Sequence, residues 1–350
     1  MIFIKKIYFT TISFFFTYLI LILPFNILNH LFTGISVLNI SSFMICGFFY
    51  IFLILFFKTK SSFFFRFLVY QAMGIGFISF NVSLPTYLIH LFTSIDSFYL
   101  GIFCISLIFL LTSTSLYNGR TIKEKKVKIY SSKVKKNYKF IFISDVHLGS
   151  NSVIYLKKII KRIEDLKYDV LIIGGDLVDL SSFKIEYLET FKTVKKKILY
   201  VTGNHEFYLK NSEKIFRSLT RNKIKIIDSK KIQIDDLNII GIGDNTSSKD
   251  QLNLIKKLKA KNKFNLLVIH KPIFWDKIGD KIDLMLSGHT HNGQIFPFNF
   301  LVKLKYKYIY GMYHQKNSSL YVSSGVGCWG PKMRLGTQNE IVSVFIKKKK

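Results

Sequence analysis

The sequence predicts an α/β protein in which four N-terminal transmembrane helices precede a two-sheet α/β sandwich covered by helices. Three observations carry this prediction. The first third of the chain consists of long apolar stretches with almost no charge. The remainder alternates short runs of β-branched and aromatic residues with amphipathic helical segments, which is typical of α/β domains. Several of the strand-like runs end in polar residues, as expected where strands direct their carboxyl ends at a shared site.

Four apolar stretches are long enough to span a bilayer, which takes about 20 residues of helix. They lie near residues 7–29, 36–57, 67–92 and 98–117. Pro24, Asn81 and Pro85 interrupt two of them, which spanning helices tolerate when they pack against neighbours. We therefore assign residues 1–119 to a transmembrane domain. A cleaved signal peptide is the alternative for residues 1–30, but the apolar run is too long and three further spans follow.

Basic residues around these stretches predict their orientation. They precede the first span, separate the second from the third and follow the fourth: Lys5, Lys6, Lys58, Lys60, Arg66 and the run from Arg120 to Lys139. The other two loops carry none. By the positive-inside rule, both ends of the transmembrane domain face the cytoplasm. We expect an integral protein of the cell inner membrane or of a single plasma membrane, with its second domain cytoplasmic. Since no ionisable residue lies in the middle of a span, we expect an anchor rather than a transporter or channel.

Most of the net charge of +30 lies after residue 119 and comes from lysine. A strongly basic domain can indicate nucleic-acid binding or attraction to anionic lipid. The chain is also rich in Ile, Phe and Asn and has alanine only at Ala72 and Ala260, which indicates a general bias of composition. We therefore favour a solvated lysine coat over a nucleic-acid site, and keep a surface attracted to anionic lipid as an alternative.

Residues 120–138 are predicted to be a basic linker that can form an edge strand, and residues 139–350 a separate domain. Helices are predicted near 152–166, 183–196, 211–221 and 248–260, where apolar and polar residues alternate at helical spacing. Short strands are predicted at 224–227, 231–234, 238–242, 319–323 and 340–347. Together with the apolar runs described next, these elements predict two layers of sheet between helices.

Five apolar strand-like runs end in residues of the kind that bind metals. Such residues follow KFIFIS (Asp145, His147), VLIIGG (Asp176), ILYVTG (Asn204, His205), NLLVI (His270) and DLMLSG (His289, His291). Residues i and i+2 of a strand point to the same side, so each Asp-x-His or His-x-His pair can reach one cation. Two glycines before Asp176 let the backbone turn tightly, and its two carboxylate oxygens can bridge two cations. Each motif alone is weak evidence, but five in order predict one metal site at the strand ends.

The five motifs together resemble the signature of the calcineurin-like metallophosphoesterase superfamily. That signature consists of Asp-x-His, Gly-Asp-x-x-Asp, Gly-Asn-His-Glu/Asp, His and Gly-His-x-His. The chain carries it as DVH, GDLVD, GNHE, H and GHTH, and the resemblance covers residues 139–346. The later segment GVGCWGPKMRLGTQNEI, from Gly325, is similar to the bacterial branch related to lipid-A-precursor pyrophosphatases and twin-arginine-exported phosphoesterases. The four preceding spans resemble the integral-membrane members of that branch.

This resemblance implies two divalent metal ions, of the manganese, iron or zinc kind that mixed nitrogen and oxygen ligands suit. It implies one metal on Asp145, His147 and His291, the other on Asn204, His270 and His289, and Asp176 as the bridge. A metal-bound hydroxide would attack phosphorus directly, without a phospho-enzyme.

The resemblance also implies roles for residues beside the ligands. His205 would assist the leaving group, Asp179 would orient His205, and Asn204 and His205 would contact the substrate. The role of Glu206 stays open, with a structural hydrogen bond as the simpler interpretation. Two interpretations stay open for Trp329 and Arg334. They either contact the substrate or belong to a packed tail in which the arginine lies on the surface.

We therefore expect a membrane-anchored metal-dependent phosphohydrolase that acts on a phosphoester or pyrophosphate. A lipid-linked substrate is favoured because four spans exceed what tethering needs. The apolar segment 295–301 is either a lip that enters the lipid interface or a buried loop. The alternatives are a soluble nucleotide phosphodiesterase, a protein phosphatase, and a non-catalytic membrane sensor, against which the complete ligand set argues.

Overall fold

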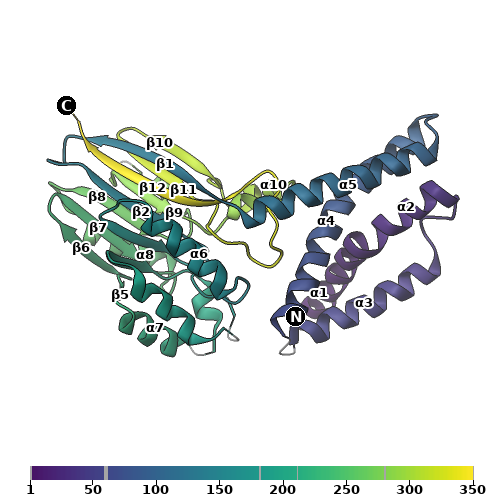
Figure 1. The fold of residues 1–350 in the computed structure, drawn as a ribbon, viewed down its shortest axis with the longest axis horizontal. Helices are drawn as coiled ribbons and strands as arrows, with labels where there is room; N and C mark the ends of the chain where they lie inside the picture. The colour runs from purple at the N-terminus through teal and green to yellow at the C-terminus, as the bar shows by residue number, and fades with distance from the viewer. Residues whose placement is uncertain (1, 59–61, 181–182, 211, 280, 350) are drawn as a thin grey trace. The chain divides into compact units, whose positions relative to one another are not determined.

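A computed structural model describes residues 2–58, 62–180, 183–210, 212–279 and 281–349 (Figure 1). The chain forms two compact units, Met1–Tyr117 with Gly330–Met333, and Asn118–Trp329 with Arg334–Lys350. Within the described ranges, the first unit is helical and every strand belongs to the second. The predicted fold class, apolar N-terminal helices followed by a two-sheet α/β domain, is confirmed.

Long apolar helices make up the first unit. In the part of the chain that the structure describes, four segments are long and apolar enough to cross a membrane: Thr10–Thr33, Ile40–Phe57, Phe64–Phe92 and Ser97–Arg120. The first segment runs from α1 (Ile2–Thr17) through a π-helical turn (Tyr18–Ile22) into α2 (Leu23–Thr33). The other three belong to α3 (Ile40–Lys58), α4 (Phe63–Phe92) and α5 (Ser97–Arg120). Each predicted span overlaps one of these segments. The π-helical turn lies just before Pro24, whose ring and missing N–H disturb the regular hydrogen-bond ladder.

Much of the surface of this helical unit is apolar, and some of its buried polar groups form hydrogen bonds inside it. Phe25, Met44 and Phe109 are among many large apolar side chains that face outward. The buried Asn26 amide donates to the Val37 carbonyl (2.9 Å) and to the Ser42 hydroxyl (2.8 Å). Outward apolar side chains and inward hydrogen bonds are the arrangement expected of helices in lipid.

Two six-stranded sheets form the second unit, within the described ranges. The order in the first sheet is β1-β12-β2-β3-β4-β5, from β1 (Ile122–Ser131), β2 (Tyr138–Ile143), β3 (Val170–Gly174), β4 (Lys197–Val201), β5 (Ile224–Ile226) and β12 (Asn339–Lys348). The order in the second is β10-β11-β9-β8-β7-β6, from β6 (Lys230–Ile234), β7 (Leu237–Ile242), β8 (Phe264–Ile269), β9 (Leu284–Ser287), β10 (Gly311–Gln315) and β11 (Ser318–Val322). β2 to β5 run parallel to one another, and so do β7, β8, β9 and β11. The carboxyl ends of each parallel set therefore meet at one edge of its sheet.

Most of the predicted elements of this unit are present, with one change of helix type. The predicted short strands overlap β5, β6, β7, β11 and β12, and helices occur at α6 (Val153–Glu164), α7 (Ser212–Arg221) and α8 (Ser248–Leu258). Residue 211, the predicted start of α7, lies outside the described residues. Segment 183–196 contains a 3₁₀ helix (Ile185–Thr193), on which Leu188 and Phe191 are buried. The sequence did not predict β10, α9 (Trp275–Ile278) or α10 (Phe298–Lys305).

Side-chain alternation along the strands separates three apolar cores. Phe140 of β2 and Leu266 of β8 point between the two sheets and share one core. The next residue on the first sheet, Ile141, packs with α6 and α7, and the next on the second sheet, Leu267, packs with α8 and α9. Since successive residues of a strand face opposite ways, each sheet buries both faces. The layers are therefore helix, sheet, sheet and helix, and the polar residues that follow the strands have no place except at the sandwich edge.

Candidate metal centre

Every candidate ligand follows a strand, and both sheets contribute. Those of the first sheet lie just after β2, β3 and β4, and those of the second just after β8 and β9: Asp145, His147, Asp176, Asn204, His270, His289 and His291. Asp145, His147 and His270 are fully buried, and Asp176 is nearly so. Chain topology thus brings residues up to 146 positions apart to one end of the sandwich.

The ligand-type atoms of these residues form three overlapping groups, within each of which all atoms lie within 4.8 Å of one another. The groups are Asp145, His147 and His291; His147, Asp176 and His205; and Asp176, His270 and His289. His147 Nε2 lies 3.0 Å from His291 Nε2, and His270 Nε2 lies 3.0 Å from Asp176 Oδ2. Asp176 and His147 each belong to two groups, so these two side chains connect the three candidate sites.

Asn204 adds an amide oxygen to this arrangement. Its Oδ1 atom is buried and has no hydrogen-bond partner among the described residues. The residue after it, His205, donates its backbone N–H to Asp176 Oδ1 (3.0 Å). A buried polar atom without a partner is costly, so a ligand is expected to satisfy it. The donor set therefore fits divalent cations, which take oxygen ligands together with neutral imidazoles.

The ligands converge through left-handed turns rather than through strand alternation. We predicted that each i, i+2 pair points to one side of a strand, but β2 ends at Ile143 and β9 at Ser287, before the pairs begin. Five ligands have positive φ instead, at +57° for Asp145, +51° for His147, +52° for Asp176, +74° for His289 and +49° for His291. This conformation costs about 1 kcal/mol or more for a residue with a side chain. Such a concentration of strain is typical of functional sites.

Glycines beside the ligands allow the loops after the strands to approach one another closely, both within the first sheet and between the two sheets. Gly175 has φ +94°, and a Cβ atom there would strike the ring of His270. A Cβ atom at Gly203 would strike the carboxylate of Asp176. The tight turn predicted before Asp176 is present, and these positions need glycine for space as well as for backbone conformation.

Glu206 joins the loop that carries Asp176 to the loop that carries Asn204. Its fully buried carboxylate accepts hydrogen bonds from the backbone N–H groups of Leu177 (2.6 Å), Val178 (3.0 Å) and Gly203 (2.9 Å). Burial, reinforced by the charge of Asp176, raises the pKa of Glu206 to about 7. Its position thus favours the structural interpretation left open by the sequence.

Asp179 lies beside His147, and not beside His205 as we predicted. Its Oδ2 atom is 3.6 Å from His147 Nδ1, and its carboxylate accepts hydrogen bonds from the backbone N–H (2.9 Å) and the hydroxyl of Ser150. No hydrogen bond or ion pair joins Asp179 to His205 within the described residues. The reason is a bridge between Val178 and Leu148, which leads the chain after Asp176 back along the loop after β2. Burial raises the pKa of Asp179 to about 8.

His205 stands at the mouth of the site. Its side chain is 19% exposed, and its Nε2 atom lies 3.8 Å from Asp176 Oδ2. The rings of Tyr208 and Trp329 lie edge-on to its ring at 5.5 and 6.0 Å, and both are well exposed. Burial lowers the pKa of His205. This imidazole can therefore reach a bound molecule while keeping contact with the buried carboxylate.

Two further residues hold the candidate ligands in place: Tyr306, which the sequence did not indicate, and Arg334, for which it indicated a different role. Arg334, expected on the surface if it belonged to a packed tail, is fully buried and donates to the backbone carbonyls of His291 (2.8 Å) and Gly327 (2.7 Å). The Tyr306 hydroxyl lies 2.7 Å from His289 Nε2, which leaves the Nδ1 atom directed at His270. Neither residue stands in a local pattern that predicts such a contact.

The charges of the site depend on each other. Burial raises the pKa of Asp145 to about 6 and lowers that of His147 to about 3. Burial opposes a charge on His270 as well, but the carboxylates of Asp176 and Asp145 outweigh it and raise the pKa of His270 to about 10. So many ionisable groups cannot all keep their usual charge in a water-poor site. Divalent cations would favour the carboxylate and neutral imidazole forms together.

Comparison with known proteins places this arrangement in a family context. Residues 138–293 match the profile of the calcineurin-like phosphoesterases. A Helicobacter pylori protein described as an uncharacterized metallophosphoesterase is 36% identical over 231 residues, which cover 63% of this chain and 62% of that protein. A similarly described Campylobacter jejuni protein is 34% identical over 267 residues, 71% of each chain. A Danio rerio protein described as a transmembrane protein with a metallophosphoesterase domain is 26% identical over 231 residues, 60% of this chain and 53% of that one.

Proposed function

Because the chain belongs to the calcineurin-like phosphoesterase family, we propose that it is a membrane-anchored metal-dependent phosphohydrolase that cleaves a phosphoester or pyrophosphate bond. The chain matches less than two thirds of the length of the Helicobacter protein, so the activity of the whole protein is part of the proposal. The observation that carries it is the convergence of three groups of buried ligand-type atoms at the strand ends of both sheets.

Two divalent cations would be held by side chains from both sheets. One would bind Asp145, His147 and His291, the other Asn204, His270 and His289, with Asp176 shared. The short distances within the groups and the unsatisfied Asn204 Oδ1 support this assignment. When bound, manganese, iron or zinc ions would supply Lewis-acid polarisation of phosphoryl oxygens and would lower the pKa of water.

The remaining residues would position groups and move a proton. His205, partly exposed and held by Asp176, would donate its Nε2 proton to the oxygen of the leaving group. Together with Asn204 it would contact the substrate phosphoryl group. Asp179, placed 3.6 Å from His147 Nδ1, would fix the orientation of that imidazole, as carboxylates commonly do for ligand histidines.

We propose a lipid-linked substrate because an apolar surface adjoins the site. Phe296, Phe298, Phe300 and Leu301 of segment 295–301 are exposed and Ile295 is buried, which supports an interfacial lip over a buried loop. Within it begins α10, which has no buried residue and exposes Leu301 (53%) and Leu304 (85%) next to the basic Lys303 and Lys305. Apolar side chains beside lysines are suited to the interface of an anionic membrane. The segment begins four residues after the candidate ligand His291, so a lipid bound there would lie near the phosphoryl site.

Replacing both leucines of α10 tests the lipid assignment in the full-length protein. With Leu301→Ser and Leu304→Ser combined, turnover of a lipid pyrophosphate in vesicles should fall about tenfold or more, because two apolar side chains no longer enter lipid. Turnover of a soluble p-nitrophenyl ester should not change. Ile154→Ser is the matched control, since Ile154 is an equally exposed aliphatic residue on α6 (77%) and should affect neither substrate. Equal losses on both substrates, or a preference of the intact protein for a soluble nucleotide, would contradict the lipid assignment.

We also propose that the second unit is cytoplasmic, on the basis of the lysine and arginine distribution. Reporter fusions after Arg120 should behave as cytoplasmic, and fusions near Thr33 or Ile95 as external. The measurement is the activity of a paired cytoplasmic and periplasmic reporter in cells. An external signal after Arg120 would overturn the orientation and move the substrate to the outer side of the membrane.

A further inference from the structure

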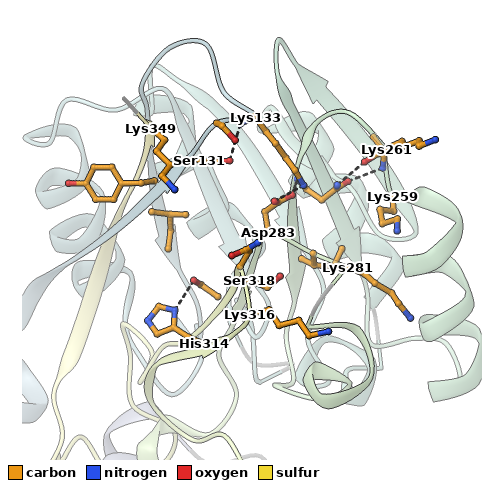
Figure 2. A pocket seen from close by; sticks show the side chains of 18 of the residues that line it. Ser131, Lys133, Lys259, Lys261, Lys281, Asp283, His314, Lys316, Ser318 and Lys349 are labelled. Carbon is orange, nitrogen blue, oxygen red and sulfur yellow. Dashed lines mark hydrogen bonds and ion pairs between the residues drawn. The ribbon is translucent and has the colours of Figure 1, made fainter.

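A lysine-lined cavity of about 710 Å³ lies at the end of the second unit opposite the candidate metal centre (Figure 2). Its walls include Asn265 at the start of β8 and Asp283 just before β9, whereas His270 and His289 follow the other ends of these strands. The six residues of β8 separate the two sites by about 20 Å. The cavity is therefore distinct from the catalytic crevice, and its size is within the range of small-ligand sites.

The charge of the cavity is strongly one-sided. Seven lysines line it, from the ends of β1 and β12, the turns after β1 and β10, and the segments before β8 and β9: Lys128, Lys133, Lys259, Lys261, Lys281, Lys316 and Lys349. Among the described lining residues Asp283 is the single acid, and it already pairs with Lys133 (2.8 Å) and accepts from the Asn265 N–H (2.8 Å). The other six lysines have no ion pair with any described residue. Seven of the eight lysine and aspartate side chains in the lining are therefore basic.

Neutral donors accompany the lysines. Figure 2 shows Ser131 close to Lys133, and Ser318 and His314 close to Lys316. The hydroxyl of Ser319, also in the lining, lies 3.0 Å from His314 Nδ1. Ammonium groups together with hydroxyl donors bind phosphate oxygens through charge-assisted hydrogen bonds.

We propose that this cavity binds a compact anion that carries two or more phosphate groups. Lysines from six separate segments surround one hollow rather than following a track, which favours a small polyanion over a nucleic-acid backbone. A free polyphosphate compound and a phosphorylated lipid headgroup share this chemistry. The cavity lies about 20 Å from the candidate metal centre, so a ligand can bind there without being hydrolysed.

Calorimetric titration of the purified full-length protein with inorganic tripolyphosphate at low salt tests the proposal. Lys281→Gln combined with Lys316→Gln should weaken binding at least about tenfold, because two charge-assisted contacts are lost. The matched control is Lys256→Gln combined with Lys257→Gln, which removes two exposed lysines from α8 outside the cavity. Both double variants should hydrolyse a soluble ester like the wild type. Unchanged hydrolysis would show that the candidate metal centre is intact, so a weaker binding of tripolyphosphate in the Lys281/Lys316 variant would come from the cavity.

The remaining outcomes either identify the source of the phosphate groups, a lipid headgroup or a free polyphosphate, or contradict the proposed binding site. Competition by a short-chain anionic phospholipid, lost in the Lys281/Lys316 variant, would support a headgroup as the source, and failure to compete would support a free polyphosphate. Unchanged affinity in the Lys281/Lys316 variant would overturn the site. Equal loss in the Lys256/Lys257 control, or no binding by the wild type, would leave only a general lysine coat and would equally overturn it.

Discussion

Asp176→Ala is expected to remove bound metal and activity together. The carboxylate belongs to two of the three ligand groups, with Oδ2 at 3.0 Å from His270 Nε2 and Oδ1 bonded to the His205 N–H. Without it, each proposed cation loses a ligand and the contact between Asp176 and His270 across the two sheets is lost. We expect turnover to fall by about a thousandfold or more, because the cations supply several kcal/mol of transition-state stabilisation. Metal analysis by mass spectrometry, followed by turnover on a panel of monoesters, diesters and lipid pyrophosphates, measures both effects.

The control for this prediction is His205→Asn, which should separate binding from chemistry. The His205 ring lies at the mouth of the site, and the proposed cations have other ligands. The variant should keep most of its metal while turnover drops by about 10²–10⁴-fold, the usual contribution of a general acid. If His205→Asn stripped the metal as thoroughly as Asp176→Ala, the division of roles would be wrong. A wild-type protein that held metal but hydrolysed nothing on the panel would support a sensor instead.

Glu206→Ala is expected to destabilise the second unit by about 3 kcal/mol or more. Three short hydrogen bonds to buried backbone N–H groups disappear, and each unsatisfied group costs about 1–3 kcal/mol. The loops of Asp176 and Asn204 lose their common anchor, so the metal content should also fall. Thermal unfolding of the full-length protein in detergent, with and without added manganese, measures the loss.

Glu189→Ala and Glu206→Gln are the comparisons for this second prediction. Glu189 forms an exposed ion pair with Lys192, and removing it should change the free energy of unfolding by less than about 1 kcal/mol. Glu206→Gln retains an acceptor oxygen and should be intermediate. Equal melting temperatures for the wild type and Glu206→Ala would show that the buried carboxylate does not hold the two loops.

The sequence alone predicted most of the elements and named the residues of the candidate centre. Strand-forming runs, amphipathic helices and long apolar stretches are local patterns, because side-chain periodicity reflects which faces are buried. The position of Asp145, Asp176 or His270 directly after such a run is local as well. Parallel strands place their carboxyl ends at the same edge, so these residues could be grouped without coordinates.

The tertiary structure alone decided which side chains meet. Asp179 contacts His147 because Val178 pairs with Leu148, and this pairing joins segments 30 residues apart. Arg334 is buried against His291 because the segment after β11 passes behind the ligands, a placement that no local pattern reports. The seven lysines of the lysine-lined cavity come from six segments, each of which resembles an ordinary solvated stretch in the sequence. Such contacts depend on the order of strands in the sheets and on the turns between them, and the free energies that select this order are sums over residues far apart in the chain.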